Sequence, residues 1–173
     1  IAALRDLPAS APPRTRHLAF LLGGATDATG RPALVAGARV RRGRMSLGLE
    51  LQLVAPLSLD AGDGATVRVS QYGVDAAPCF HVSRFALCGL ATAGVIGGAG
   101  DQLAHATSVW RPALAVGARV EASVPVLPRV ALRLHVDALQ ALTSSRFTVD
   151  EMPVWTSEPR QLWVGGGVQA VFP

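Results

Sequence analysis

The sequence contains no lysine and no asparagine, and all 16 of its basic residues are arginine. This bias is typical of a high-GC genome, in which AT-rich codons are depleted, so it reflects coding rather than chemistry. Charged residues make up only 16% of the 173 residues, whereas 50% are apolar. Low charge with high apolar content excludes a disordered chain, and the length fits one domain with an ample core.

Long apolar runs, metal-binding motifs and redox motifs are also lacking. Glycine clusters or charges interrupt every apolar stretch before it reaches the roughly 18 residues of a membrane-spanning α-helix. The two cysteines, Cys79 and Cys88, are nine residues apart, which does not fit a CxxC motif. The histidines lack the HxH or HExxH spacing of metal sites. We therefore expect no metal and no cofactor.

The net charge of +4 and the isoelectric point near 10.4 raise the question of an anionic partner. Most arginines, however, stand singly between apolar neighbours, and no aromatic residues are interleaved with them as a stacking platform for bases. The pattern therefore predicts no nucleic-acid binding.

Alternation of apolar residues with small or polar ones dominates the chain after residue 15, as in Met45-Ser46-Leu47-Gly48-Leu49. This period of two predicts strands with one apolar face. We expect eight strands, at about 16–26, 33–42, 44–56, 65–79, 85–97, 108–124, 129–143 and 160–172. Short turns at 42–43, 81–84 and 125–128 alternate with longer loops at 27–32, 57–64, 98–107 and 144–159.

This order predicts an up-and-down meander with all short turns, and both chain ends, at one end. Residues 1–15 carry Pro8, Pro12 and Pro13 and no sustained period, which predicts a stiff linker from a missing upstream segment. Because the first residue is Ile and no signal peptide is visible, we expect a processed or trimmed piece of a longer precursor. The barrel domain is expected over 16–173.

Several predicted strands reach the roughly 9–11 residues that a membrane-spanning strand needs. Aromatic residues stand near the strand ends, as interfacial girdles require. Phe80, Phe85 and Phe172 are expected on the turn side, and Trp110 and Trp155 on the loop side. The apolar set of alternating positions in each strand, which we call the apolar parity, is nearly pure Leu, Val and Ala. This composition predicts a lipid-facing surface.

The last strand, QLWVGGGVQAVFP, is the most specific signal. It resembles the C-terminal assembly signal of Gram-negative outer-membrane barrels, an alternating strand that closes on an aromatic residue, although Pro173 makes the aromatic residue penultimate. The lipid-facing positions of this signal are Leu162, Val164, Val168, Ala170 and Phe172. Over residues 16–173 the chain is similar to small eight-stranded barrels of the OmpA and OmpX type, and most closely to uncharacterised outer-membrane β-barrel domains of high-GC Gram-negative bacteria.

The resemblance implies an all-β, eight-stranded antiparallel up-and-down closed transmembrane barrel in the bacterial outer membrane. It implies the lipid bilayer and the barrel-assembly machinery as partners, and loops 98–107 and 144–159 could present a surface to a protein partner. The alternative is a soluble lipocalin-like barrel or β-sandwich. A soluble protein should carry abundant charge on its outer parity, whereas here the polar parity is largely Gly, Ala and Ser with sparse charges.

Several charged residues share the parity that would face the barrel interior. These are Arg39, Glu50, Arg68, Arg119, Glu121, Arg133, His135 and Asp137. Buried charges must be paired, so we expect a charge network that fills the lumen, with a narrow polar pore or a small-molecule-binding barrel as the alternative. Of the four histidines, His17, His81, His105 and His135, only His135 has an acid nearby on its own strand face, and no GxSxG motif occurs. We expect no catalytic residues.

Two pairings follow from the predicted turns. In an antiparallel hairpin the numbers of two facing residues add up to a constant. If Val124 faces Val130, that constant is 254 and Glu121 faces Arg133. A two-residue turn at Ser83-Arg84 gives 167, which places Cys79 opposite Cys88. In an oxidising periplasm these cysteines are expected to form a disulfide. The arginines at 41, 42 and 44 would lie at the level of anionic headgroups or in a solvated turn. The expected role is an integral outer-membrane domain that anchors, stabilises the envelope or presents loops.

Overall fold

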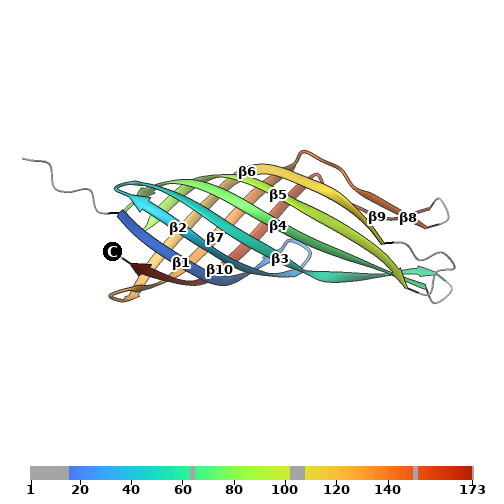
Figure 1. Cartoon of the computed structure of the whole chain (residues 1–173), viewed down its shortest axis with the longest axis horizontal. Coiled ribbons are helices and arrows are strands. Elements are labelled where there is room, and N and C mark those ends of the chain that lie inside the picture. The colour runs from blue at the N-terminus through green and yellow to red at the C-terminus, as the bar shows by residue number, and fades with distance from the viewer. Residues whose placement is uncertain (1–15, 63–64, 102–107, 150–151, 173) are drawn as a thin grey trace, which may run out of the picture.

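The computed structural model describes residues 16–62, 65–101, 108–149 and 152–172 (Figure 1). All of its regular structure is β. The strands are β1 Arg16–Asp27, β2 Pro32–Arg42, β3 Met45–Gly62, β4 Ala65–Val82, β5 Phe85–Asp101, β6 Ser108–Leu127, β7 Val130–Ala141, β8 Arg146–Val149, β9 Met152–Thr156 and β10 Arg160–Phe172. In the described residues no helix is long and apolar enough to cross a membrane.

Eight strands close into one antiparallel barrel in the order β1-β10-β7-β6-β5-β4-β3-β2. The barrel closes where β1 pairs with β10, from Leu18 opposite Phe172 to Asp27 opposite Trp163. The predicted fold class is therefore confirmed, and the β-sandwich alternative is wrong. Each of these eight strands has a partner on both sides, which is the condition for a β-structure in hydrocarbon.

The short connections and both ends of the described barrel lie at one end, and the long connections lie at the other (Figure 1). We call these the turn end and the loop end. The tight turns are local in origin: Gly43 has φ of +63° between β2 and β3, and Ser83 has φ of +56° between β4 and β5. The predicted linker at 1–15 lies outside the described residues.

The predicted strands match the barrel strands, but β3 and β5 continue further towards the loop end than expected, and β4 and β6 continue further towards the turn end. The predicted loop at 144–159 is not simple loop, because it contains the short hairpin β8–β9. These strands have only four and five residues, too few for the alternation to stand out from the sequence.

The outer surface of the barrel is apolar, whereas the inner surface combines charged residues with small and apolar ones. On β3, Leu49 is 57% exposed whereas the next residue, Glu50, is 1% exposed. The same alternation runs along β7, where Leu132 and Leu134 are exposed and Arg133 is buried. A belt of Leu, Val and Ala on the outside fits the hydrocarbon layer of a bilayer.

Near the loop end apolar residues face inward and Arg68 faces outward, which corrects the prediction made for Arg68. A register shift between Val54 and Leu57 turns Leu57 inward, where it packs against buried Val67 and Val69. Because odd-numbered residues of β4 face inward throughout, Arg68 lies on the outer surface and is exposed. The prediction that Arg68 faces the lumen is therefore wrong.

Aromatic residues lie on the outer surface near both ends of the barrel. Phe80, Phe85 and Phe172 are 46%, 62% and 43% exposed at the turn end. At the loop end Trp110 stacks on Tyr72 with ring centroids 5.9 Å apart. The expected aromatic girdles are thus present at these positions.

Trp155 departs from the girdle pattern. It lies on β9, stacks on Phe147 of β8 with a centroid separation of 5.6 Å, and packs against the buried Val67, Val69 and Ile96. It therefore attaches the β8–β9 hairpin to the barrel mouth, and its assignment to the lipid interface was wrong.

Candidate functional site

A cluster of paired charges occupies the middle of the lumen, and we call it the charge cluster. Strands β2, β3, β6 and β7 supply it from opposite sides of the barrel, and each member is at most 5% exposed. Its members are Arg39, Glu50, Arg119, Glu121, Arg133, His135 and Asp137. Seven of the eight residues predicted to face the lumen therefore lie together, and Arg68 does not.

Arg119 is the centre of the charge cluster. Its Nε and Nη2 donate to the two carboxylate oxygens of Asp137 at 2.6 and 2.7 Å, and its Nη1 donates to Glu50 Oε2 at 2.6 Å. The bidentate contact joins neighbouring strands, and the contact with Glu50 crosses the lumen. Such paired geometry makes charge-assisted hydrogen bonds strong and directional.

The other two arginines complete a balanced set. Arg39 donates through Nη1 and Nη2 to the two carboxylate oxygens of Glu121. Arg133 donates to Glu50 Oε1 at 2.8 Å, and its Nε lies 2.7 Å from Glu121 Oε2. Three guanidinium groups thus face three carboxylates, so desolvation of each charge is offset by close partners.

The register predicted for Glu121 was wrong, although Glu121 does contact Arg133 as predicted. Glu121 lies opposite His135, and Ser123 lies opposite Arg133. β6 continues to Leu127, which pairs with Val130, and the pairing shifts by one residue between Pro125 and Leu127. A turn placed at 125–128 therefore misplaces every residue further along. Arg133 reaches Glu121 diagonally.

Glycines on neighbouring strands make room for the large charged side chains. Gly37 lies opposite Glu50, and a Cβ on Gly37 would be 3.0 Å from Glu50 Cγ and 2.3 Å from the Leu49 carbonyl oxygen. Gly165 lies opposite His135, and a Cβ there would be 2.5 Å from the imidazole. The small inward-facing residues therefore leave the space that the large side chains of the charge cluster occupy.

Two polar contacts escaped the sequence analysis. Asp75 on β4 is 5% exposed and accepts a hydrogen bond from Thr92 at 2.6 Å. Asp75 shares the odd parity of Cys79, which would have placed it in the lumen. The second contact joins Ser46 and His81, whose Oγ and Nε2 are 2.7 Å apart.

The Ser46–His81 pair lacks two features of a nucleophilic site. Ser46 is 7% exposed and does not line either large cavity, and no described carboxylate bonds to His81. A serine nucleophile needs both substrate access and an oriented base. Within the described ranges no group of His, Cys, Asp and Glu is arranged to hold a metal.

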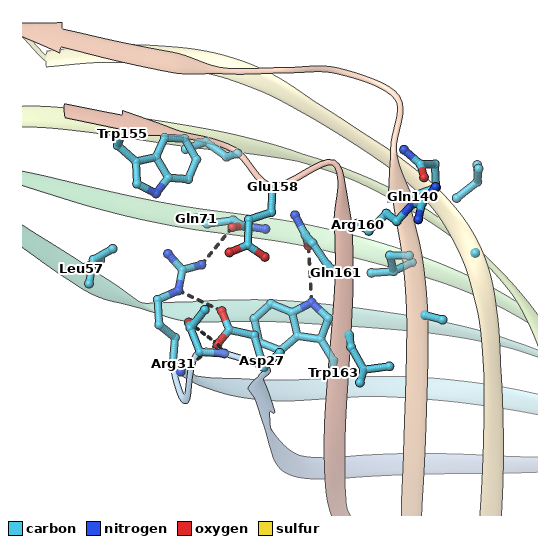
Figure 2. Close-up of a pocket in the computed structure, with 18 residues that line it drawn as sticks. Asp27, Arg31, Leu57, Gln71, Gln140, Trp155, Glu158, Arg160, Gln161 and Trp163 are labelled. Atoms are coloured by element: carbon cyan, nitrogen blue, oxygen red, sulfur yellow. Dashed lines mark hydrogen bonds and ion pairs between the residues drawn. The ribbon is translucent and has the colours of Figure 1, made fainter. Parts of the chain in front are cut away.

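The charge cluster separates two cavities. The loop-side cavity has a volume of about 710 Å³ and combines two indoles with amide and charged groups (Figure 2). Arg31 bonds to Asp27 at 3.2 Å and to Gln71 at 3.3 Å, whereas the Glu158 carboxylate enters from the β9–β10 connection (Figure 2). Trp163, which is 2% exposed, donates to Gln161 at 3.4 Å.

The turn-side cavity has a volume of about 640 Å³ and lies between the charge cluster and the short turns. The described residues that line it include five basic side chains and one acidic one, Glu121. The basic residues are His17, Arg39, Arg41, His81 and Arg84. Of the arginines at 41, 42 and 44, only Arg41 lines it.

The predicted disulfide is confirmed. Cys79 and Cys88 lie opposite each other on β4 and β5, and their sulfurs are bonded at 2.06 Å. Both are at most 2% exposed and point into the lumen beside the turn-side cavity. The bond joins the two strands of one hairpin close to its turn.

On β10 the residues predicted as an assembly signal lie on the outer face. Leu162, Val164, Val168 and Phe172 are between 43% and 52% exposed, and Ala170 is partly exposed. Trp163 points inward as the alternation predicts. The role of this strand as an assembly signal stays a prediction, and Pro173 lies outside the described residues.

No known protein-family profile matches the chain, and no curated protein sequence matches it. Three solved structures are similar in fold. A major outer membrane protein from Thermus thermophilus has a TM-score of 0.66 at 11% identity, covering 91% of this chain and 100% of that one. The attachment invasion locus protein Ail of Yersinia pestis has a TM-score of 0.57 at 12% identity, covering 91% and 96%.

Neisserial surface protein A has a TM-score of 0.51 at 12% identity, again covering 91% of this chain and 96% of that one. At these identities the likeness concerns the fold. The barrel architecture, the apolar outer belt and these three structures together place the chain among proteins with the fold of small outer-membrane β-barrels.

Proposed function

We propose that this protein is a non-catalytic, non-conducting integral barrel of the bacterial outer membrane, which anchors and presents its loop end. The observation that carries the proposal is the charge cluster, which crosses the lumen from β2 and β3 to β6 and β7. A barrel of eight strands encloses little more than its own side chains. Here the enclosed side chains are long, buried and bonded to each other across the barrel.

The loop end supports the presenting role. Strands β3 to β6 extend beyond the opposite wall, and the β8–β9 hairpin is fixed to the mouth by Trp155 and Phe147 (Figure 1). A hairpin held by partly buried aromatic rings offers a more rigid surface than an open loop. A protein partner would bind there, and the outer face of β10 would be read by the barrel-assembly machinery during insertion.

Conductance in planar lipid bilayers tests the proposal. The parent protein should insert without steady current, because the charge cluster fills the middle of the lumen. The matched variant R39A/E121A removes one cation and one anion together, so the charge balance stays and only the filled volume is lost. It should show small, frequent openings. A parent current as large as that of the variant would contradict the closed lumen.

The loop-side cavity favours a second candidate, binding of a small polar molecule with an apolar ring face. Trp155 and Trp163 supply flat apolar surfaces, and Gln71, Gln161 and Glu158 supply hydrogen-bonding groups (Figure 2). Titration with neutral di- and trisaccharides, followed by tryptophan fluorescence, tests it. The W155A variant should lose the response, and W110A, on the outer surface, should keep it. Equal responses would exclude the cavity as the site.

A further inference from the structure

The turn-side cavity has an excess of positive charge that its own residues do not neutralise. Among the described residues its only acidic lining residue is Glu121, which accepts both of its hydrogen bonds from Arg39 and also contacts Arg133. The carboxylate is therefore fully used within the charge cluster. Glu121 therefore forms no ion pair with Arg41 or Arg84 at the mouth of the cavity.

The basic side chains lie in a row along the inner wall that Ser46 interrupts between Arg41 and His81. His17 on β1 lies directly opposite Arg41 on β2, and Arg41 lies directly opposite Ser46 on β3. Ser46 bonds to His81 on β4, so the row spans four neighbouring strands. Arg84 follows in the next turn, beside β6, where its carbonyl oxygen accepts from the Ser123 amide.

Donors remain open at the mouth and at the floor of this row. Arg41 donates through Nε to the Gly43 carbonyl, which holds the side chain at the turn, and its Nη groups have no ion pair among the described residues. The Arg84 guanidinium likewise forms no ion pair with any residue that the structure describes. At the floor, Arg39 is 2% exposed and its buried Nε has no hydrogen-bond partner in the described structure.

We propose that the turn-side cavity binds a water-soluble anion that carries two or more phosphate groups and enters from the turn end. Guanidinium groups match phosphate oxygens in geometry and stay charged at any physiological pH. Low-dielectric walls lined by one sign of charge concentrate counter-ions in a cleft. The interior position of the row favours a soluble phosphate compound over a membrane lipid, whose headgroup lies outside the barrel wall.

Calorimetric titration with inorganic pyrophosphate tests this proposal, using the folded barrel in a non-ionic detergent at low salt. The parent should bind at a single saturable site. The variant R41Q/R84Q should bind at least about tenfold more weakly, since charge-assisted contacts to two guanidinium groups are lost. The control R44Q/R129Q loses the same charge from exposed side chains that do not line the cavity, and it should bind like the parent.

Three results would overturn the proposal. Absence of saturable binding would show that the cavity is only solvated. Equal weakening in R41Q/R84Q and R44Q/R129Q would show that the net charge of the barrel, rather than the cavity, attracts the anion. Loss of pyrophosphate binding when phosphatidylglycerol replaces neutral lipid in nanodiscs would assign the same donors to a lipid headgroup. Heat-induced mobility shifts on electrophoresis would verify that each variant is folded.

Discussion

Replacement of Arg119 by methionine should destabilise the barrel more than any other single change in the charge cluster. Asp137 would lose both of its hydrogen bonds and keep only the imidazole of His135 as a basic neighbour, with its Nε2 3.9 Å away. Glu50 would lose one partner but keep Arg133 at 2.8 Å. Two arginines would then face three carboxylates. Leaving a buried charge unpaired costs about 3–5 kcal/mol.

The double variant R119M/D137L separates charge imbalance from lost packing. It removes a cation and its bidentate anion together, so Arg39 and Arg133 again balance Glu50 and Glu121. Replacing a buried ion pair by apolar residues of similar volume is often neutral, so stability should return to within about 1 kcal/mol of the parent.

The assay is reversible urea unfolding of the barrel in lipid vesicles, followed by the fluorescence of buried Trp163 and exposed Trp110. Arg129→Met is the control, because Arg129 is exposed in the β6–β7 turn and should tolerate the change. A free energy of unfolding for Arg119→Met within about 1 kcal/mol of the parent would refute the reasoning. So would a double variant as unstable as the single one.

Three further predictions test the outer belt, Glu121 of the charge cluster and the disulfide. Leu49→Arg should cost about 2–4 kcal/mol in vesicle refolding, whereas Ser123→Arg, inside the turn-side cavity, should be tolerated; equal losses would contradict the lipid-facing assignment. Glu121→Ala should cost about 3–5 kcal/mol in urea unfolding because it leaves Arg39 without its bidentate partner, and a harmless substitution would contradict the network. Reduction of the Cys79–Cys88 bond should cost less than about 3 kcal/mol because the closed loop is short, and mass spectrometry of the unreduced, alkylated protein should find neither thiol free.

The barrel could be predicted from the sequence because one pattern is repeated in every strand. Outward Leu and Val alternate with inward small or charged residues, and the tight turns at 42–43 and 81–84 fix the strand order. The disulfide was predictable for the same reason, since the two-residue turn at Ser83-Arg84 carries no bulge between Val82 and Phe85. Local turn geometry and strict alternation are both readable from the sequence.

Two of the errors arise where the regular pairing is interrupted. The shift after Val54 brings Leu57 inward, and the loop end of the barrel packs like a water-soluble core. Arg68 lies outside for another reason, because the unbroken alternation of β4 turns its even-numbered residues outward. β6 continues to Leu127, which pairs with Val130, instead of turning at 125–128; together with the one-residue shift at Pro125 this displaces Glu121 by two positions from the predicted pairing. A bulge adds a residue without changing composition, so nothing in the local sequence announces it. Likewise, Gly117 looks like a free inward position, yet a Cβ there would be 2.0 Å from the Ala138 carbonyl oxygen.

The charge cluster also accounts for how the strands find one register. The outer belt is a repetitive series of Leu, Val and Ala, so a slip of two residues between β2 and β3 would leave it almost unchanged. Inside, the same slip would move Glu50 from Gly37 to Val35 or Arg39, where no space exists for it. A Cβ at Gly37 would already be 3.0 Å from Glu50 Cγ. Lipid-facing residues thus place the strands in the membrane, and the paired charges with their facing glycines select the register.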